Sequence, residues 1–281
     1  MTTWEEFKEK GNTEFKKKNY NSAIELYSDG IAIDPDQDVL YSNRALCYKA
    51  MENYRQALQD IQKALDLNPA NVKNLKRKFE LLLITGKLPE AETVIQKCCN
   101  LEPREFQHKQ DLSNTKANIA LMNSFYDEFT RKNFEKIEEI GGKLVQVCHG
   151  NYELKQYYIE ALIHNNKLQE ATKFWTTKLT DKERSSDEFL FIICRIFYLE
   201  GNFEKSKQTL KRLLQRVNDN PVYNRLHHIL NNIEKEKEVA NKIFKDGKYA
   251  EAIDAYSKLL EIDPENKLFN STIYANRGLC K

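Results

Sequence analysis

The sequence predicts an all-α protein made of stacked helix hairpins. Three prolines, Pro35, Pro69 and Pro103, lie 34 residues apart, and a fixed period of this size is typical of repeat proteins. The alanines that follow the same period are Ala23, Ala57 and Ala91. Only nine glycines and six prolines occur in 281 residues, which disfavours a turn-rich all-β protein and favours helices joined by short loops.

The first three units each predict two helices that pack as a hairpin. A large residue lies near the start of each first helix, and a small residue follows it four positions later in two of the three units. These pairs are Phe7/Gly11, Tyr41/Ala45 and, with a large residue in the small position, Leu75/Phe79. The second helices carry an alanine followed four residues later by a large residue, in the pairs Ala23/Tyr27, Ala57/Ile61 and Ala91/Ile95. One hairpin cannot bury its apolar face alone, so we expect neighbouring hairpins to stack.

After Pro103 the units become irregular, but the same order of features continues. A turn residue followed by a large apolar residue recurs at Asn133-Phe134, Lys167-Leu168, Asn202-Phe203 and Lys248-Tyr249. The middle units cover residues 121–148, 154–179 and 189–217, with Ile137 and Ser206 where the usual alanine would lie. Gly141 and Gly142 lie inside a predicted second helix, where each costs about 1 kcal/mol relative to alanine, so we expect a kink or a close helix contact there.

The C-terminal segment returns to the regular pattern, with Ala252, Tyr256 and Pro264 spaced as in the first unit. Residues 276–281 then predict the beginning of another first helix without its second helix, which gives about seven and a half hairpins. Because that helix lacks a partner, we expect residues 270–281 to be poorly ordered. The alternative is that they pack back on the helix predicted over residues 248–262.

The composition argues against several classes of function. Forty-four lysines and arginines against 42 aspartates and glutamates leave a net charge of +2, without the basic excess expected of a nucleic-acid-binding protein. Neither a run of about eighteen apolar residues nor a signal-peptide pattern occurs, so we expect no membrane association and no secretion.

The six cysteines predict neither a metal site nor a catalytic nucleophile. No Cys-x-x-Cys pair occurs, and no cysteine has metal-ligand spacing to a histidine. The cysteines are interpreted as reduced, packed side chains, because nothing in the sequence favours a thiolate. We expect no metal, no cofactor and no catalytic residue, and therefore no enzymatic activity in this chain.

Five residues on predicted first helices could form a binding site for an anion. Lys8 and Asn12 lie four residues apart in the first unit, Asn43 lies in the second, and Lys73 and Arg77 lie four residues apart in the third. First helices line the concave face of such an array, so these side chains are expected to face one groove. All five can donate hydrogen bonds to carboxylate oxygens. The competing interpretation is that they are ordinary solvated surface residues.

The repeat and these residues resemble a known family. The 34-residue unit resembles the tetratricopeptide repeat, and Lys8-Glu-Lys-Gly-Asn12, Tyr41-Ser-Asn43-Arg44 and Lys73-x-x-x-Arg77 look like the two-carboxylate clamp of tetratricopeptide co-chaperones. The resemblance implies a right-handed superhelical solenoid. It also implies a cytoplasmic co-chaperone adapter that binds the Glu-Glu-Val-Asp tails of heat-shock protein 70 or heat-shock protein 90 and assists protein folding. In that family the first four clamp residues would hold the terminal aspartate, and Arg77 would reach the rest of the peptide.

Near the C-terminus, Lys237, Asn241 and Asn276 repeat the lysine and the two asparagines of this clamp. The spacing between the two asparagines grows from 31 to 35 residues, and we expect the four extra residues to lie in a loop over residues 265–271. The second clamp is expected to be incomplete, because the lysine and arginine of a third unit are absent from these 281 residues.

The middle units do not repeat the clamp. The residues at the corresponding positions are Met122, Tyr126, Tyr157, Glu188 and Ile192, which cannot hold a carboxylate. We interpret their aromatic residues as packing residues, with a groove for an apolar segment as the alternative. The chain is thus divided into an N-terminal clamp block (1–104), a degenerate middle block (105–232) and the start of a second clamp block (233–281).

This order of blocks resembles the tetratricopeptide-containing part of the DnaJ (heat-shock protein 40) C subfamily. That subfamily carries a J-domain with a His-Pro-Asp motif after its last repeat, and no His-Pro-Asp occurs in these 281 residues. Two alternatives stay open. One is a stress-inducible organising scaffold that links two chaperones through two clamps, and the other is an adapter belonging to a larger enzyme whose catalytic domain lies outside this chain.

Overall fold

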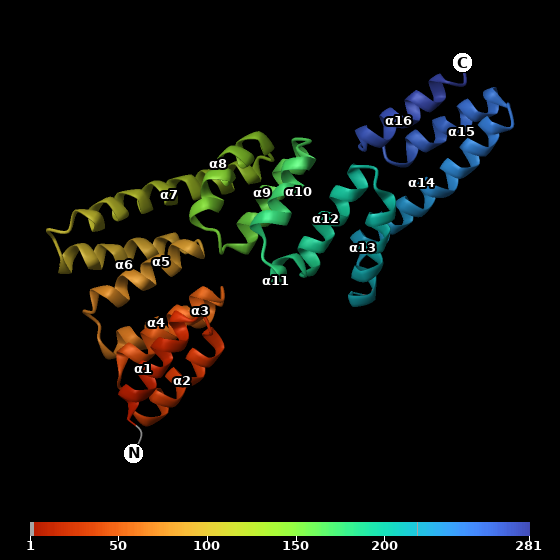
Figure 1. Cartoon of the computed structure of the whole chain (residues 1–281). Helices are drawn as coiled ribbons and strands as arrows, with labels where there is room; N and C mark the ends of the chain where they lie inside the picture. The colour runs from red at the N-terminus through yellow and green to blue at the C-terminus, as the bar shows by residue number, and fades with distance from the viewer. Residues whose placement is uncertain (1–2, 218) are drawn as a thin grey trace. The chain divides into compact units, whose positions relative to one another are not determined.

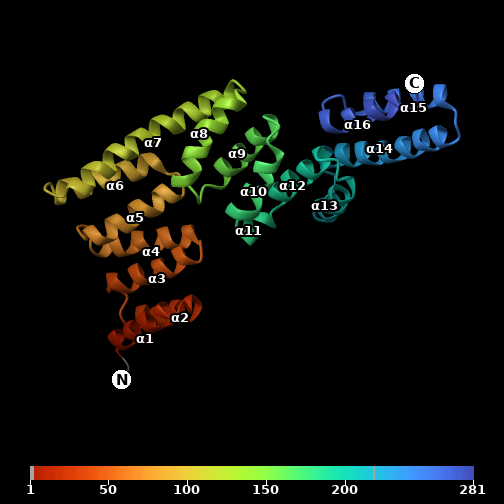
Figure 2. The same cartoon turned by 45° about the horizontal axis from the view of Figure 1, so that its top comes forward.

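The computed structural model describes residues 3–217 and 219–281, and these residues form sixteen α-helices and no β-strand (Figures 1 and 2). The predicted all-α class is therefore confirmed. The chain divides into two compact units, Met1–Tyr158 and Ile159–Lys281.

In the first unit, consecutive helices pair into hairpins: α1 with α2, α3 with α4 and α5 with α6, while α7 packs against both α6 and α8. Their bounds are α1 (Trp4–Lys16), α2 (Tyr20–Ile33), α3 (Asp38–Ala50), α4 (Tyr54–Leu67), α5 (Val72–Ile84), α6 (Leu88–Leu101), α7 (Phe106–Thr130) and α8 (Phe134–Val147). Helix α9 (Tyr152–His164) crosses from the first unit into the second.

In the second unit, α12 pairs with α13, and α14 packs against both α13 and α15. The helices are α10 (Leu168–Lys178), α11 (Asp181–Arg184), α12 (Asp187–Leu199), α13 (Phe203–Arg216), α14 (Pro221–Lys245), α15 (Tyr249–Ile262) and α16 (Lys267–Gly278). The short α11 was not predicted; Thr180 and Glu183 form a reciprocal capping box at its start. No helix of the described chain is both long and apolar enough to span a membrane.

The hairpin turns share one backbone feature. In seven turns of the described chain, a residue with positive φ lies two positions before the second helix begins. Three of these residues are Gly86, Gly201 and Gly247, which adopt this region without a Cβ clash. The other four are Lys18, Glu52, Lys132 and Asn166. The recurrence confirms seven hairpins followed by one further helix, α16.

The small-and-large pairs predicted for the second helices form the cores of the first hairpins. All six residues of the three alanine pairs are buried. At the predicted double glycine, a Cβ added to Gly141 would lie 3.1 Å from both Phe125 Cε2 and Tyr158 Cδ2. The expected close contact is therefore present, and α8 runs through it as one helix.

Helix α16 begins earlier than the sequence predicted. The four extra residues between the asparagines were expected in a loop, but they extend the N-terminal end of the helix. Asn276 is the tenth residue of α16, whereas Asn43 is the sixth residue of α3. Four residues are close to one helical turn, so Asn276 keeps the same face of its helix.

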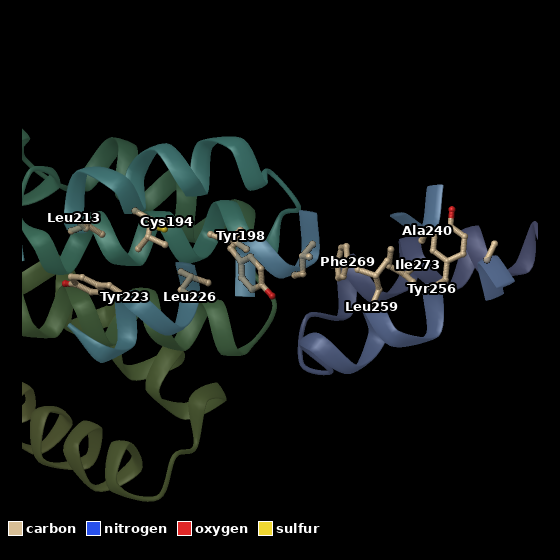
Figure 3. Packing of buried hydrophobic residues seen from close by; sticks show 14 of the residues in the cluster. Cys194, Tyr198, Leu213, Tyr223, Leu226, Ala240, Tyr256, Leu259, Phe269 and Ile273 are labelled. Atoms are coloured by element: carbon tan, nitrogen blue, oxygen red, sulfur yellow. The ribbon is translucent and has the colours of Figure 1, made fainter. Parts of the chain in front are cut away.

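The expectation that residues 270–281 have nothing to pack against is wrong. Ile273 and Phe269 of α16 are buried (Figure 3), and the Phe269 ring lies 5.4 Å, centroid to centroid, from Phe203 of α13. Helix α16 thus contacts α12 and α13 as well as its sequence neighbour α15. Tyr274 and Leu279, by contrast, are exposed.

A polar contact fixes the loop before α16. The Tyr198 hydroxyl donates to Asp263 Oδ2 at 2.5 Å, and the Asn266 side-chain amide donates to the Tyr198 carbonyl at 3.4 Å. Burial and the bond to Asp263 raise the pKa of Tyr198, so its hydroxyl stays protonated as a donor.

Replacing Phe269 by alanine is expected to release α16 from this contact, because a buried Phe→Ala change costs about 3–5 kcal/mol. In the unchanged chain the amides of residues 273–277 should exchange with solvent as slowly as those of α15. In Phe269→Ala they should exchange quickly while those of α5 stay unaffected. Tyr274→Ala is the control, since that ring is exposed; fast exchange of α16 in the unchanged chain would contradict the packing.

Candidate functional site

Helix α1 presents Lys8 and Asn12 one turn apart on the same face. Thr3 caps the N-terminal end of the helix, because its Oγ1 accepts a hydrogen bond from the backbone amide of Glu6. The Lys8 ammonium lies 5.3 Å from the centre of the Trp4 ring and 3.5 Å from Glu9 Oε1. Its aliphatic stem is therefore held along α1, and its only ionic neighbour among the described residues is an exposed carboxylate.

Asn12 joins two hairpins through its amide oxygen. Asn12 Oδ1 accepts a hydrogen bond from the Tyr27 hydroxyl at 2.9 Å and another from Asn43 Nδ2 at 3.2 Å. Because both acceptor positions of the oxygen are occupied, Asn12 offers its NH2 group to any further partner. That NH2 group makes one long hydrogen bond, of 3.4 Å, to Glu9. Asn12 can therefore serve a ligand as a hydrogen-bond donor.

The absence of a side chain at Gly11 lets the Tyr27 ring approach the backbone of α1. A Cβ added to Gly11 would lie 2.6 Å from Tyr27 Cε1, a distance that real Cβ atoms do not reach. Tyr27 therefore packs closely against the backbone of α1, and its hydroxyl donates to Asn12 from there. Burial raises the pKa of Tyr27, which keeps the hydroxyl protonated.

Arg77 on α5 reaches toward α3 through Ser42. Its Nη1 donates to Ser42 Oγ, and Ser42 in turn donates to Asn74 Oδ1 at 2.5 Å. The side-chain amide of Asn74 donates a hydrogen bond to Asp38 Oδ2 at 3.3 Å. Burial lowers the pKa of Arg77, while the charge of Glu80 opposes this shift. The guanidinium is thus half-buried and bonded to a neutral hydroxyl, and no carboxylate of the described residues contacts it directly.

Lys73 lies one turn before Arg77 on α5 and is exposed. It forms no ion pair with any described residue. The five predicted residues lie on α1, α3 and α5. Asn12 and Asn43 are hydrogen-bonded to each other, and Arg77 binds Ser42, which precedes Asn43. Each lysine lies one helical turn before the other predicted residue of its helix.

Residues that hold these side chains were not predicted as part of the site. They are Tyr27, Asp38, Ser42 and Asn74. A further support is Arg44, which pairs with the buried Asp60 through two hydrogen bonds of 2.8 Å and donates to Ser28 at 2.8 Å. A signal was present in the sequence, because Tyr-Ser occurs at 27–28 and again at 256–257, and Asn-Arg occurs at 43–44 and again at 276–277.

The C-terminal repeat of the pattern reproduces part of this geometry. The Tyr256 hydroxyl donates to Asn241 Oδ1 at 2.8 Å, as Tyr27 does to Asn12, and Arg277 donates to Ser257 at 3.2 Å. Lys237 lies one turn before Asn241 on α14. In this part of the described chain, however, Asn276 forms no hydrogen bond with Asn241, so the link between successive first helices is not made.

The predicted middle positions divide into two groups. Met122 and Ile192 are buried packing residues, whereas Tyr126, Tyr157 and Glu188 reach the surface. The cysteines are free and buried, as expected. Burial raises the pKa of four of these thiols to about 11, which disfavours thiolates; they are Cys47, Cys98, Cys148 and Cys194.

Comparison with known proteins supports the same repeat. Residues 39–71 and 244–266 match the tetratricopeptide repeat family. The chain is 26% identical over 274 residues to DnaJ homolog subfamily C member 7 of Mus musculus, covering 98% of this chain and 55% of that protein. A homologue of the same protein in Dictyostelium discoideum is 25% identical over 279 residues, covering 98% and 51%. The chain spans about half the length of these curated relatives.

Among solved structures, the tetratricopeptide domain of P58(IPK) matches with a TM-score of 0.71 at 22% identity, covering 99% of this chain and 78% of that chain. This likeness concerns the fold, and it agrees with the hairpins described above.

Gly11→Ala is expected to destabilise the first hairpin by about 1–3 kcal/mol, because the new Cβ must displace the Tyr27 ring. The change should lower the thermal unfolding midpoint. Gly278→Ala is the matched control, since nothing lies within 4 Å of a Cβ at that position. An unchanged midpoint in Gly11→Ala would show that Tyr27 does not lie on the α1 backbone.

Proposed function

Because the chain is an array of tetratricopeptide repeats, we propose that its first three hairpins bind the free C-terminus of an acidic peptide. The ligand would be the Glu-Glu-Val-Asp tail of heat-shock protein 70 or heat-shock protein 90, and the chain would act as a co-chaperone adapter in the cytoplasm. One observation carries the proposal: among the described residues no carboxylate contacts Lys73 or Arg77 directly, and Arg77 binds Ser42, the neighbour of Asn43, which is hydrogen-bonded to Asn12.

The charge arrangement favours an anion over a neutral ligand. The half-buried guanidinium of Arg77 is bonded to a hydroxyl, which does not neutralise it. A peptide carboxylate would supply that charge, and each charge-assisted hydrogen bond contributes about 1.5–3 kcal/mol. Asn12 and Asn43 add neutral donors that can select for oxygen atoms at fixed positions.

The sequence similarity supports the co-chaperone part of the proposal. The alignment with DnaJ homolog subfamily C member 7 covers 98% of this chain, so it includes both blocks that carry clamp residues. The five residues on α1, α3 and α5 also resemble the two-carboxylate clamp of tetratricopeptide co-chaperones.

A scaffold that links two chaperones is the second candidate. It is favoured by the Tyr256–Asn241 and Arg277–Ser257 bonds, which repeat the supports of the first clamp around Lys237. In this function the C-terminal block would bind a second tail once further donors complete the site.

A peptide ending in Glu-Glu-Val-Asp is expected to bind the chain with an affinity on the order of micromolar, since a few charge-assisted bonds are offset by ordering costs. Titration calorimetry with the free acid and with the C-terminally amidated peptide tests the role of the terminal carboxylate. Equal binding of both peptides would contradict the proposal.

Lys73→Ala is expected to weaken binding of that peptide by roughly tenfold or more, because one charge-assisted bond is lost. The helix content should stay unchanged, since the side chain is exposed and alanine favours helices. Lys63→Ala, an exposed lysine on the second helix α4, is the control and should bind normally. Higher salt should weaken peptide binding by the unchanged chain. If Lys73→Ala and Lys63→Ala lost the same amount of peptide affinity, the effect would be one of general charge and not of a clamp.

A further inference from the structure

The first helices of the fourth and fifth hairpins carry aromatic residues at clamp positions. Tyr126 lies eight residues before α8, as Asn12 lies eight residues before α2. Tyr157 lies eleven residues before α10, as Arg77 lies eleven residues before α6. Because hairpins of one array share their register, these tyrosines lie on the face of their helices that carries the clamp in the first three hairpins.

The charge at this face is reversed. Glu153 lies fifteen residues before α10, the position that Lys73 holds before α6. Glu153 is exposed and forms no ion pair with any described residue. It accepts a hydrogen bond from the Tyr157 hydroxyl at 2.7 Å, which fixes the carboxylate beside the aromatic rings.

Three rings are linked by direct contact or through the buried Phe125, and they are here called the aromatic patch: Tyr126, Phe129 and Tyr157. The centroids of Phe129 and Tyr157 are 4.3 Å apart, and both tyrosines contact the buried ring of Phe125. Tyr126 is 39% exposed and Phe129 is 37% exposed. The patch is therefore anchored by packing, as the sequence suggested, but its outer surface remains open.

The phenols of the patch stay neutral. The bond to Glu153 and burial raise the pKa of Tyr157 to about 12. Burial and the charge of Glu153 also raise the pKa of Tyr126. No lysine or arginine of the described chain lies over these three rings. The faces of the rings are electron-rich, and a fixed carboxylate lies next to them.

We propose that the aromatic patch and Glu153 bind a lysine or arginine side chain in an extended segment of a partner polypeptide. The cation would lie over the tyrosine rings and pair with Glu153, and an adjacent apolar residue would cover Phe129. Aromatic faces attract such cations, most strongly where the charge is partly desolvated. The clamp and the patch would then be two sites of opposite charge preference on equivalent helix faces.

Two short peptides test this preference against the full chain by fluorescence anisotropy. The probes are a dye-labelled Ala-Leu-Arg-Leu-Ala with both ends blocked and the same peptide with glutamate in place of arginine. Because both ends are blocked, neither peptide offers the free C-terminal carboxylate that the proposed clamp requires. The arginine peptide is expected to bind at least about fivefold more tightly than the glutamate peptide.

Glu153→Lys should reverse this order, so that the glutamate peptide binds more tightly. Glu135→Lys, an exposed residue on the second helix α8, is the matched control and should keep the original order. Tyr157→Phe keeps the ring but removes the hydroxyl that donates to Glu153. This variant should reduce the difference in affinity between the arginine and glutamate peptides. Equal binding of both probes to the unchanged chain, binding of neither, or an unchanged order in Glu153→Lys would each overturn the proposal.

Discussion

The contact of Tyr27 with the bare backbone of Gly11 connects the packing of the array to its candidate site. The missing Cβ lets the ring close the first hairpin, and from that position its hydroxyl fixes Asn12. Asn12 then accepts a bond from Asn43 of the next hairpin, so the stacking of hairpins and the orientation of the site depend on one side chain. The equivalent bond between Tyr256 and Asn241 forms beside Ala240, so the tyrosine–asparagine bond itself does not require a glycine, whereas the close contact with the α1 backbone does.

A shared register lets one scaffold carry different chemistry at equivalent positions. Where the third hairpin has Lys73, the fifth has Glu153, and where the first has Asn12, the fourth has Tyr126. The backbone geometry that aims these residues is set by buried residues on the other faces of the helices. Surface residues can therefore change the charge of this helix face without changing the fold, as expected for an array in which each unit contacts only its neighbours.

The sequence predicted features that depend on spacing along a helix, and it missed those that depend on contacts between hairpins. The 34-residue period, the buried alanine pairs and the common face of Lys8 and Asn12 follow from helical periodicity. The link from Arg77 to Ser42 does not, because it depends on how closely α5 stacks on α3 and on the conformation of a long side chain. The early start of α16 has a local cause that could have been recognised: the Asn266 side chain caps the helix by accepting from the Phe269 amide at 3.1 Å.

In the proposed clamp Asn12 and Asn43 donate hydrogen bonds to a terminal carboxylate, and nuclear magnetic resonance of their side-chain amides reports on this contact directly. On addition of a free-acid Glu-Glu-Val-Asp peptide, the NH2 signals of Asn12 and Asn43 should shift with a common binding curve, whereas those of Asn231, in the second compact unit, should not move. The amidated peptide should leave the Asn12 and Asn43 signals near their unbound positions. Equal shifts with both peptides, or shifts that avoid Asn12 and Asn43, would contradict the account.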